Sequence, residues 1–381
     1  MTDPVYINSI AAFLPNTPVA NEDMEAVLGQ IGRRPSRARK LILRSNQITS
    51  RYYAIDRKSG RPTHTNAELT AAAIRQLNGN VPLEKIDVLA CGTTLPDQLL
   101  PNHAVMVHGE LGLPPCEVVA TSGVCVSGMM ALKYGYLSIC SGESTNAVAT
   151  GSENVSSLLR GHNFSSEIEA PEDIPEKPRE IAFAKDFLRW MLSDGAGAVW
   201  LSNTANPEGI SLQIDWIFQK SYAGQLETCM YAGAEKGADG SLQGWREYLP
   251  QELLDESIFA IKQDVKLLNA KIIEYTVVRP LRELVRTGLI RAEEIDWFLP
   301  HYSSGFFRDK VHAGMQTAGC EIAQEKWFTN LQTKGNTGSA SIYIILEELF
   351  ASNRLRKGET LLCYIPESGR FSTAFMKLTV V

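Results

Sequence analysis

Residues Glu117–Leu132 read Glu-Val-Val-Ala-Thr-Ser-Gly-Val-Cys-Val-Ser-Gly-Met-Met-Ala-Leu. The apolar, β-branched start predicts a buried strand, the small residues predict a turn, and Met129 and Leu132 begin a run with helical spacing. Cys125 therefore lies where a helix begins, in a positive field that favours the nucleophilic thiolate. Backbone N–H groups at such a helix start can also bind an oxyanion. This stretch alone leaves a buried structural cysteine open as the alternative.

The layout around Cys125 occurs a second time in the chain. The landmarks repeat at an offset of about 210 positions: helices over 66–77 and 272–287, strand starts at Ile86 and Ile295, helices over 104–111 and 305–317, small-residue turns over 123–128 and 335–340, and strands over 146–153 and 361–368. Matched landmarks at a nearly constant offset indicate a duplicated α/β unit.

Duplication predicts where the functional groups meet. Related halves pack about a pseudo-twofold axis, so equivalent helix starts face one another and bring Cys125 to Asn336. His301 ends the strand Trp-Phe-Leu-Pro-His, at the edge where ligands gather on open α/β sheets. We expect Cys125, His301 and Asn336 to converge as a catalytic group, although His301 alone would be taken as a structural histidine.

Four motifs resemble those of the thiolase-fold condensing enzymes, in particular the β-ketoacyl-acyl-carrier-protein synthase III group: Thr121–Gly128, Leu299–His301, Gly335–Ser341 and Ser193–Val199. The resemblance covers essentially the whole chain. It implies a thiolase-like α/β fold of five αβαβα layers, with two duplicated halves about a pseudo-twofold axis. The N-terminal half would span 1–205, with an insert at about 152–190, and the C-terminal half 206–381.

The same resemblance assigns roles to the site. Cys125 would attack an acyl thioester and carry the acyl group as an acyltransferase does. The backbone N–H groups of Cys125 and Ser368 would form the oxyanion hole. His301 and Asn336 would hold the carbonyl of the second thioester while its α-carbon becomes nucleophilic. No cofactor and no metal are implied, since the substrates are acyl-carrier-protein or coenzyme A thioesters.

The chain departs from this family at its final loop. Where relatives have a glycine-rich turn, it reads Pro366-Glu-Ser-Gly-Arg-Phe-Ser372. Glu367 and Arg370 are unusual beside an acyl site, and they would bind a substrate carbonyl or pair with each other. The family's adenine-stacking tryptophan is also missing from the N-terminal basic segment, since no tryptophan precedes Trp190.

That segment is basic although the chain carries a net charge of −6. Its basic residues are Arg33, Arg34, Arg37, Arg39, Lys40, Arg44 and Arg51. A local basic patch on an acidic protein favours a specific anionic partner, and an acidic acyl carrier protein or the phosphates of coenzyme A fit. A solvated helix face is the alternative. Nucleic acid is not expected, because basic and aromatic residues do not interleave there.

The opening stretches Phe13–Val19, Pro35–Lys40, Ile42–Asn46 and Arg51–Asp56 resemble the ketosynthases of dialkylresorcinol biosynthesis. That resemblance implies joining a β-ketoacyl thioester to an enoyl or acyl thioester and closing a cyclohexanedione, which an aromatising partner enzyme converts to a resorcinol. Decarboxylative condensation of an acyl-coenzyme A with malonyl-acyl-carrier protein, a thioester acyltransferase or hydrolase, and a silent subunit are the alternatives. The intact Cys125, His301 and Asn336 argue against the last.

Composition agrees with a large α/β protein. Its 381 residues are 44% hydrophobic and can bury two cores. The seven scattered cysteines contain no C-x-x-C pair, which indicates neither a disulfide framework nor a zinc site. With no signal-like start and no apolar run of ~18 residues, we expect a cytoplasmic protein without a membrane span. The family resemblance implies a homodimer in which Leu95–Pro101 approaches the partner's tunnel, and a lid or pocket wall within 152–190, for which a plain surface excursion is the alternative. The glycine-rich region 223–250, with its aromatic residues, is expected to line the entry to the site.

Overall fold

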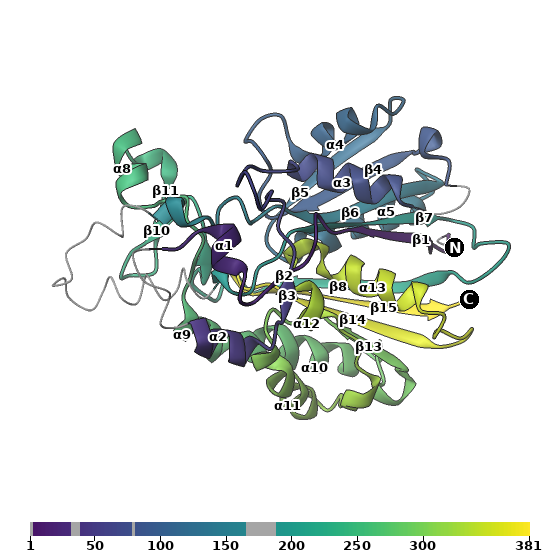
Figure 1. The fold of residues 1–381 in the computed structure, drawn as a ribbon. Coiled ribbons are helices and arrows are strands. Elements are labelled where there is room, and N and C mark those ends of the chain that lie inside the picture. The colour runs from purple at the N-terminus through teal and green to yellow at the C-terminus, as the bar shows by residue number, and fades with distance from the viewer. Residues whose placement is uncertain (1–2, 32–38, 78–80, 165–187) are drawn as a thin grey trace.

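A nine-stranded mixed sheet organises the molecule (Figure 1). The computed structural model describes residues 3–31, 39–77, 81–164 and 188–381. The strand order is β13-β14-β15-β8-β1-β7-β6-β4-β5. The bounds are β1 Tyr6–Phe13, β4 Val88–Thr93, β5 Glu117–Ser122, β6 Asn146–Glu153, β7 Gly195–Ser202, β8 Leu212–Ser221, β13 Trp297–Pro300, β14 Thr360–Pro366 and β15 Ser372–Val380.

The sheet consists of the same arrangement twice. In the first half β4 pairs in parallel with β5 and β6, β6 is antiparallel to β7, and β7 is antiparallel to β1. In the second half β13 is parallel to β14, β14 is antiparallel to β15, and β15 is antiparallel to β8. A parallel bridge between Phe298 and Trp327 takes the place of the pairing between β4 and β5. The predicted duplication is therefore present, and the division near residue 205, between β7 and β8, stays a prediction.

Helices complete five layers, visible from top to bottom in Figure 1. Between the two halves of the sheet lie α5 (Ser127–Cys140) and α13 (Ser341–Ala351), whose buried side chains share one core with both. Helices α3 (Asn66–Arg75) and α4 (His103–Leu111) cover the outer face of the first half. The outer face of the second half is covered by α9 (Val265–Ile273), α10 (Arg279–Arg286) and α11 (Arg308–Ala318). Each central helix thus begins close to the other half.

Sequence signals explain where the helices start. Thr65 caps α3 through a reciprocal capping box with Glu68, and the Asn102 side chain accepts the Val105 N–H at the start of α4. Such caps satisfy N–H groups that a helix leaves open. The predicted helix over 272–287 is longer, because a π-helical turn, η4 (Glu274–Val278), joins α9 to α10.

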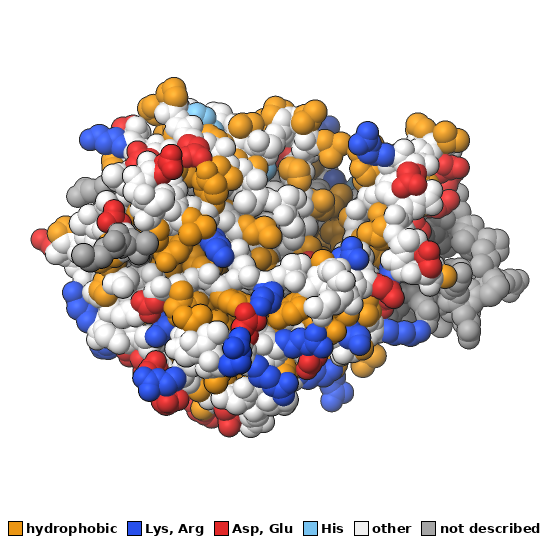
Figure 2. All heavy atoms as spheres, turned by 180° about the vertical axis from the view of Figure 1, so that it is seen from behind, with side chains coloured by type: hydrophobic (Ala, Val, Ile, Leu, Met, Phe, Trp, Pro, Cys, Tyr) orange, Lys and Arg blue, Asp and Glu red, His pale blue; other side chains and the backbone are white. Residues whose placement is uncertain are grey.

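A lobe projects from the body beside the end of β8 (left in Figure 1, right in Figure 2). It contains β9 (Met230–Tyr231) paired with β12 (Lys262–Gln263), the hairpin β10 (Ala234–Lys236) and β11 (Leu242–Gly244), η3 (Trp245–Glu247) and α8 (Pro250–Asp255). Exposed apolar side chains lie on it, among them Leu249, Leu254 and Phe259.

The remaining elements are short. They are α1 Met24–Leu28, α2 Arg39–Asn46, the paired β2 Val19–Ala20 and β3 Ser50–Arg51, α12 Leu331–Lys334, and the 3₁₀ turns η1 Leu83–Lys85, η2 Gly161–Phe164, η5 Ala292–Glu294, η6 Gly305–Phe307, η7 Gln324–Lys326 and η8 Gly338–Ala340. No helix within the described ranges is long and apolar enough to cross a membrane.

One local prediction is wrong. The strand with Val118 and Val119 is not buried: β5 is the outermost strand of the first half, and these side chains are only half-buried. Apolar runs predict strands but do not distinguish a central strand from an edge strand. The open edge of β5 is consequently a surface that another chain could extend.

Candidate active site

Cys125 lies in a tight loop between β5 and α5, as predicted. The loop is fixed by the Ser127 N–H and hydroxyl, which both donate to the Val124 carbonyl at 3.0 and 2.8 Å. The Thr121 hydroxyl in turn donates to the Ser127 carbonyl at 2.8 Å. Cys125 therefore sits just before the first turn of α5, close to the positive end of that helix.

Glycines allow the segment before α13 in the second half to pack closely on this loop. A Cβ on Gly128 would lie 2.4 Å from the Ser339 carbonyl oxygen, and one on Gly151 would lie 2.2 Å from it. Only glycine allows this approach. The start of α13 consequently packs directly on α5 and β6, which is the contact that the duplication predicted for Cys125 and Asn336.

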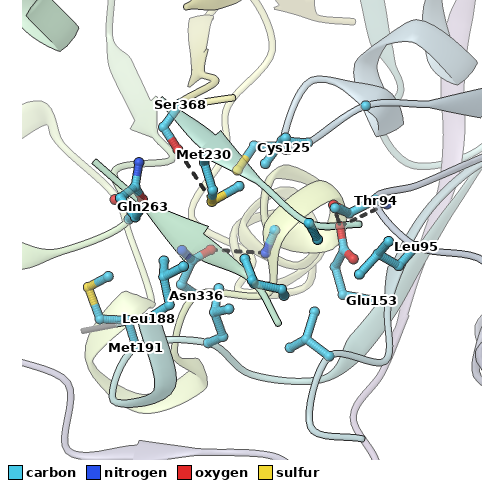
Figure 3. Close-up of a pocket in the computed structure, with 18 of the residues that line it drawn as sticks. Thr94, Leu95, Cys125, Glu153, Leu188, Met191, Met230, Gln263, Asn336 and Ser368 are labelled. Carbon is cyan, nitrogen blue, oxygen red and sulfur yellow. Dashed lines mark hydrogen bonds between the residues drawn. The ribbon is translucent and has the colours of Figure 1, made fainter. Parts of the chain in front are cut away.

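Asn336 is held from both sides. Its N–H donates to the Met191 carbonyl at 3.0 Å, and its carbonyl accepts the Ser193 N–H at 2.8 Å. Its amide oxygen accepts the Gly338 N–H at 3.0 Å, drawn as a dashed line in Figure 3. The amide oxygen is thus occupied, and the NH₂ group is the donor that Asn336 can offer to the cavity it lines.

His301 follows β13 directly. Its N–H donates to the Tyr364 carbonyl at 2.8 Å, and the residue is 3% exposed. Among the described residues its Nε2 atom has no hydrogen-bond partner. Burial lowers the pKa of His301 to about 4, so the ring is neutral at pH 7.

Two cavities meet at Cys125. The larger, of about 270 Å³, is lined by Cys125, Asn336, Glu153 and Ser368 together with apolar side chains such as Leu95, Leu188, Met191 and Met230 (Figure 3). The smaller, of about 30 Å³, is lined by Cys125, His301 and Ser368 and by apolar side chains including Leu268, Ile272, Phe307 and Val311. Of the three residues expected to converge, Cys125 lines both cavities, Asn336 the larger and His301 the smaller, and their catalytic roles stay a prediction.

The charge state of Cys125 differs from the sequence-based expectation. Burial raises the pKa of the thiol, and the carboxylates of Glu153 and Glu367 raise it further. The pKa of the thiol therefore lies above its usual range, so the prediction that a thiolate is favoured is wrong for the resting protein. A proton acceptor is needed when Cys125 attacks, and neutral His301 lines the same cavity.

The backbone around Ser368 fits an oxyanion hole. In the contacts of the described chain, neither the Cys125 N–H nor the Ser368 N–H donates to a backbone carbonyl, and the Cys125 N–H faces the sulfur of its own side chain. Both residues line both cavities. Two such N–H groups beside a nucleophile suit a tetrahedral oxyanion, and this role of Ser368 stays a prediction.

Glu153 is a site residue that the sequence did not single out. It ends β6, is 1% exposed, and its Oε1 atom accepts the Ser339 N–H at 3.0 Å and the Thr94 N–H and hydroxyl. Its Oε2 atom has no partner in the part of the chain that the structure describes. Burial raises the pKa of Glu153 to about 7. Its position at the carboxyl end of a parallel strand was the available signal.

The basic segment is only partly described. Arg33, Arg34 and Arg37 lie outside the described residues. Arg39 pairs with Glu25 at 2.7 Å and lies over the Trp190 ring, so its charge is used inside the fold. The same holds for Arg51, a buried side chain that donates to Asn21 and to the Trp190 carbonyl. Lys40 and Arg44 are exposed on α2, one turn apart, and remain candidates for an anionic partner.

The predicted lid falls mostly on residues 165–187, outside the described residues. Val155 and Leu188, near its two ends, line the larger cavity. Tyr231 of the lobe lines that cavity too, whereas Trp245 and Tyr248 do not. In the loop after β4, Leu95 reaches the cavity while Leu99 and Leu100 are 73% and 86% exposed.

Comparison with known proteins agrees with this geometry. The family model for the C-terminal part of 3-oxoacyl-[acyl-carrier-protein] synthase III matches residues 286–365, and that for the thiolase N-terminal domain matches residues 53–185. The chain is 26% identical over 360 residues to β-ketoacyl-[acyl-carrier-protein] synthase III of Chlorobaculum tepidum, covering 93% of both chains. It is 24% identical over 363 residues to the Neisseria gonorrhoeae enzyme, again covering 93% of both.

The chain is a β-ketoacyl-acyl-carrier-protein synthase III-like condensing enzyme. As such it is an acyltransferase that catalyses a Claisen-type condensation. The predicted reaction class is thereby confirmed.

Solved structures of such condensing enzymes share the fold. AbyA1, a tetronic acid condensing enzyme, matches with a TM-score of 0.76 at 20% identity over 98% of this chain and 99% of its own. A cysteine-to-serine variant of Xanthomonas campestris OleA with bound lauric acid and lauroyl-CoA matches with 0.74 at 19% over 100% of both. β-Ketoacyl-[acyl carrier protein] synthase III of Thermus thermophilus matches with 0.70 at 20% over 98% of both. The predicted thiolase-like α/β fold is therefore confirmed.

Proposed function

We propose that this condensing enzyme joins a β-ketoacyl thioester to an enoyl or acyl thioester through an acyl group on Cys125, giving a cyclohexanedione precursor of a dialkylresorcinol. The observation that carries the proposal is the free Oε2 atom of buried Glu153 in the cavity of the nucleophile. Loss of carbon dioxide from a malonyl unit requires no base. Deprotonation of a carbon between two carbonyls does, and a carboxylate with a pKa near 7 suits that task at neutral pH.

The first half-reaction is acyl transfer. Cys125 gives its proton to neutral His301 and attacks the thioester carbonyl. The Cys125 and Ser368 N–H groups stabilise the tetrahedral oxyanion. The carbon–sulfur bond to the carrier then breaks, and the carrier thiolate leaves with the proton from His301.

The second half-reaction forms the carbon–carbon bond. The β-ketoacyl carbonyl accepts a hydrogen bond from Asn336 NH₂, and a second from His301 in the tautomer that carries its proton on Nε2. Glu153 takes the proton from the carbon between the carbonyls. The resulting carbanion attacks the acyl group, and the Cys125 thiolate leaves and is reprotonated. With an enoyl group, the γ-carbon of the β-ketoacyl unit loses a proton and adds to the enoyl β-carbon, and the enoyl α-carbon takes up a proton; this second bond closes the ring.

The proposed partners follow from the surface. Lys40 and Arg44 suit an acidic acyl carrier protein or the phosphates of coenzyme A, and Arg33, Arg34 and Arg37 belong to the same proposal. The open edge of β5 and exposed Leu99 and Leu100 suit a homodimer. A downstream aromatising enzyme would consume the cyclohexanedione.

Product analysis tests the proposal. Purified protein is given a β-ketoacyl thioester with an enoyl thioester, or an acyl-coenzyme A with a malonyl thioester, and the products are identified by mass spectrometry. A cyclohexanedione from the first pair is expected. A linear β-ketoacyl product from the malonyl pair alone would instead assign ordinary chain initiation, and free acid alone would assign a hydrolase.

A further inference from the structure

The loop between β14 and β15 is built around one buried carboxylate. Glu367 is 7% exposed, and its side chain accepts the N–H groups of Gly369, of Arg370 at 3.3 Å and of Ser372 at 2.9 Å. No lysine or arginine side chain of the described residues forms an ion pair with it. Three backbone donors on one carboxylate close this turn.

One N–H group of this turn does not donate to the Glu367 carboxylate. Ser368 lies inside it, lines both cavities, and its N–H has no acceptor among the contacts of the described residues. A Cβ on Gly369 would lie 2.1 Å from the Glu367 Oε1 atom and 3.0 Å from the Val124 side chain. The carboxylate therefore packs the turn against the loop that carries Cys125.

Arg370 extends this arrangement to the lobe. Its Nε atom donates to the Leu226 carbonyl at 2.8 Å, and the Gly369 carbonyl accepts the Cys229 and Met230 N–H groups at 2.7 and 3.2 Å. Arg370 meets Glu367 through its backbone N–H, not through an ion pair of side chains, and its guanidinium contacts the lobe at the Leu226 carbonyl.

The carboxylate has a second effect on the site. Its charge acts on Cys125 and raises the pKa of that thiol, together with burial and Glu153. A turn made of glycines would hold no such charge. Glu367 thus bears on both groups that an acyl transfer needs, the nucleophile and the oxyanion donor.

We propose that Glu367 is a positioning residue, whose carboxylate fixes the Ser368 N–H group beside Cys125. The inference rests on the proposed acyl transfer to Cys125. It also predicts two opposite effects. The carboxylate speeds acyl transfer by holding the Ser368 N–H group, and its charge lowers the reactivity of the free Cys125 thiol.

Glu367→Gln tests both effects, because glutamine keeps the shape of the side chain and one acceptor oxygen but loses the charge and the second acceptor oxygen. Acylation of Cys125 by an acyl thioester, followed by intact-protein mass spectrometry, is expected to slow by about 10- to 100-fold. Alkylation of Cys125 by iodoacetamide at pH 7.5, located by peptide mass spectrometry, is expected to become roughly 3- to 10-fold faster.

Two further variants complete the test. Glu367→Asp keeps the charge but shortens the arm, so acylation falls while alkylation stays unchanged, and this variant decides the matter if the glutamine variant does not fold. Arg370→Gln, in the same turn, is the matched control and leaves alkylation unchanged. Acylation and alkylation that fall together in Glu367→Gln, or that both stay unchanged, overturn the inference. A wild-type protein that alkylates but never acylates overturns the proposed function instead.

Discussion

Replacing Glu153 by glutamine separates the two half-reactions. Glutamine retains a carbonyl oxygen for the Ser339 N–H at 3.0 Å and the Thr94 N–H at 3.3 Å, so the contact between β6 and the start of α13 is kept. It cannot take a proton. Acylation of Cys125 is expected not to slow, because loss of the Glu153 charge lowers the pKa of the Cys125 thiol. Condensation with a β-ketoacyl thioester is expected to slow by about 10²–10⁴, the usual contribution of a general base.

The pH dependence of the condensation rate tests the role of Glu153 independently. With a pKa of about 7 for Glu153, roughly a tenth of these carboxyls are ionised at pH 6 and nine tenths at pH 8. A base acts only when ionised, so the wild-type condensation rate rises with pH and levels off above pH 8. The glutamine variant should lack this rise.

Thr94→Val provides the matched control. The Thr94 hydroxyl donates to Glu153 and lowers the pKa of its carboxyl. Its removal should move the rise of the condensation rate to higher pH without abolishing it. The assay is single-turnover condensation on pre-acylated protein from pH 5.5 to 9, quenched and quantified by mass spectrometry. A glutamine variant that condenses at the wild-type rate, or one that loses acylation equally, would refute the role of Glu153 as base.

Three further predictions use other parts of the structure. Gly128→Ala sets a methyl group 2.4 Å from the Ser339 carbonyl and should lower the free energy of unfolding by about 1–3 kcal/mol in urea, whereas Gly109→Ala, with no atom within 4 Å, should not lower it. Lys40→Glu combined with Arg44→Glu should raise KM for a carrier-bound substrate but not for a short N-acetylcysteamine thioester; equal KM values would remove both residues from carrier binding. Because the pKa of Glu153 is raised above the usual 4.5 to about 7, its contribution to stability is full below pH 4.5 and is lost as pH rises through 7. Glu153→Gln should therefore abolish a loss of roughly 3 kcal/mol between pH 5 and 8 in urea titrations, and an unchanged loss would contradict the raised pKa.

The secondary structure around Cys125 and Asn336 could be predicted from the sequence because its signals are local and occur twice. A strand, a small-residue turn and an apolar helix occur around both Cys125 and Asn336, and the duplication requires their helix starts to meet. His301 followed from its place at a strand end. None of these inferences required knowledge of the contacts between side chains.

What the sequence could not predict depends on contacts between distant segments. Burial, Glu153 and Glu367 raise the pKa of the Cys125 thiol, whereas its local sequence suggests a helix field that would lower it. Arg39 and Arg51 belonged to a basic run, yet contacts with Glu25, Asn21 and Trp190 place them inside the fold. Charge patterns along a chain do not show which charges find partners when it folds.

The most direct test of the account is intact-protein mass spectrometry of wild type and Cys125→Ala with acyl, enoyl and β-ketoacyl thioesters. We expect an acyl adduct on wild type only, located on Cys125, which disappears on addition of a β-ketoacyl thioester as a carbon–carbon product forms. No adduct with any donor, or an equal adduct on the alanine variant, would contradict it.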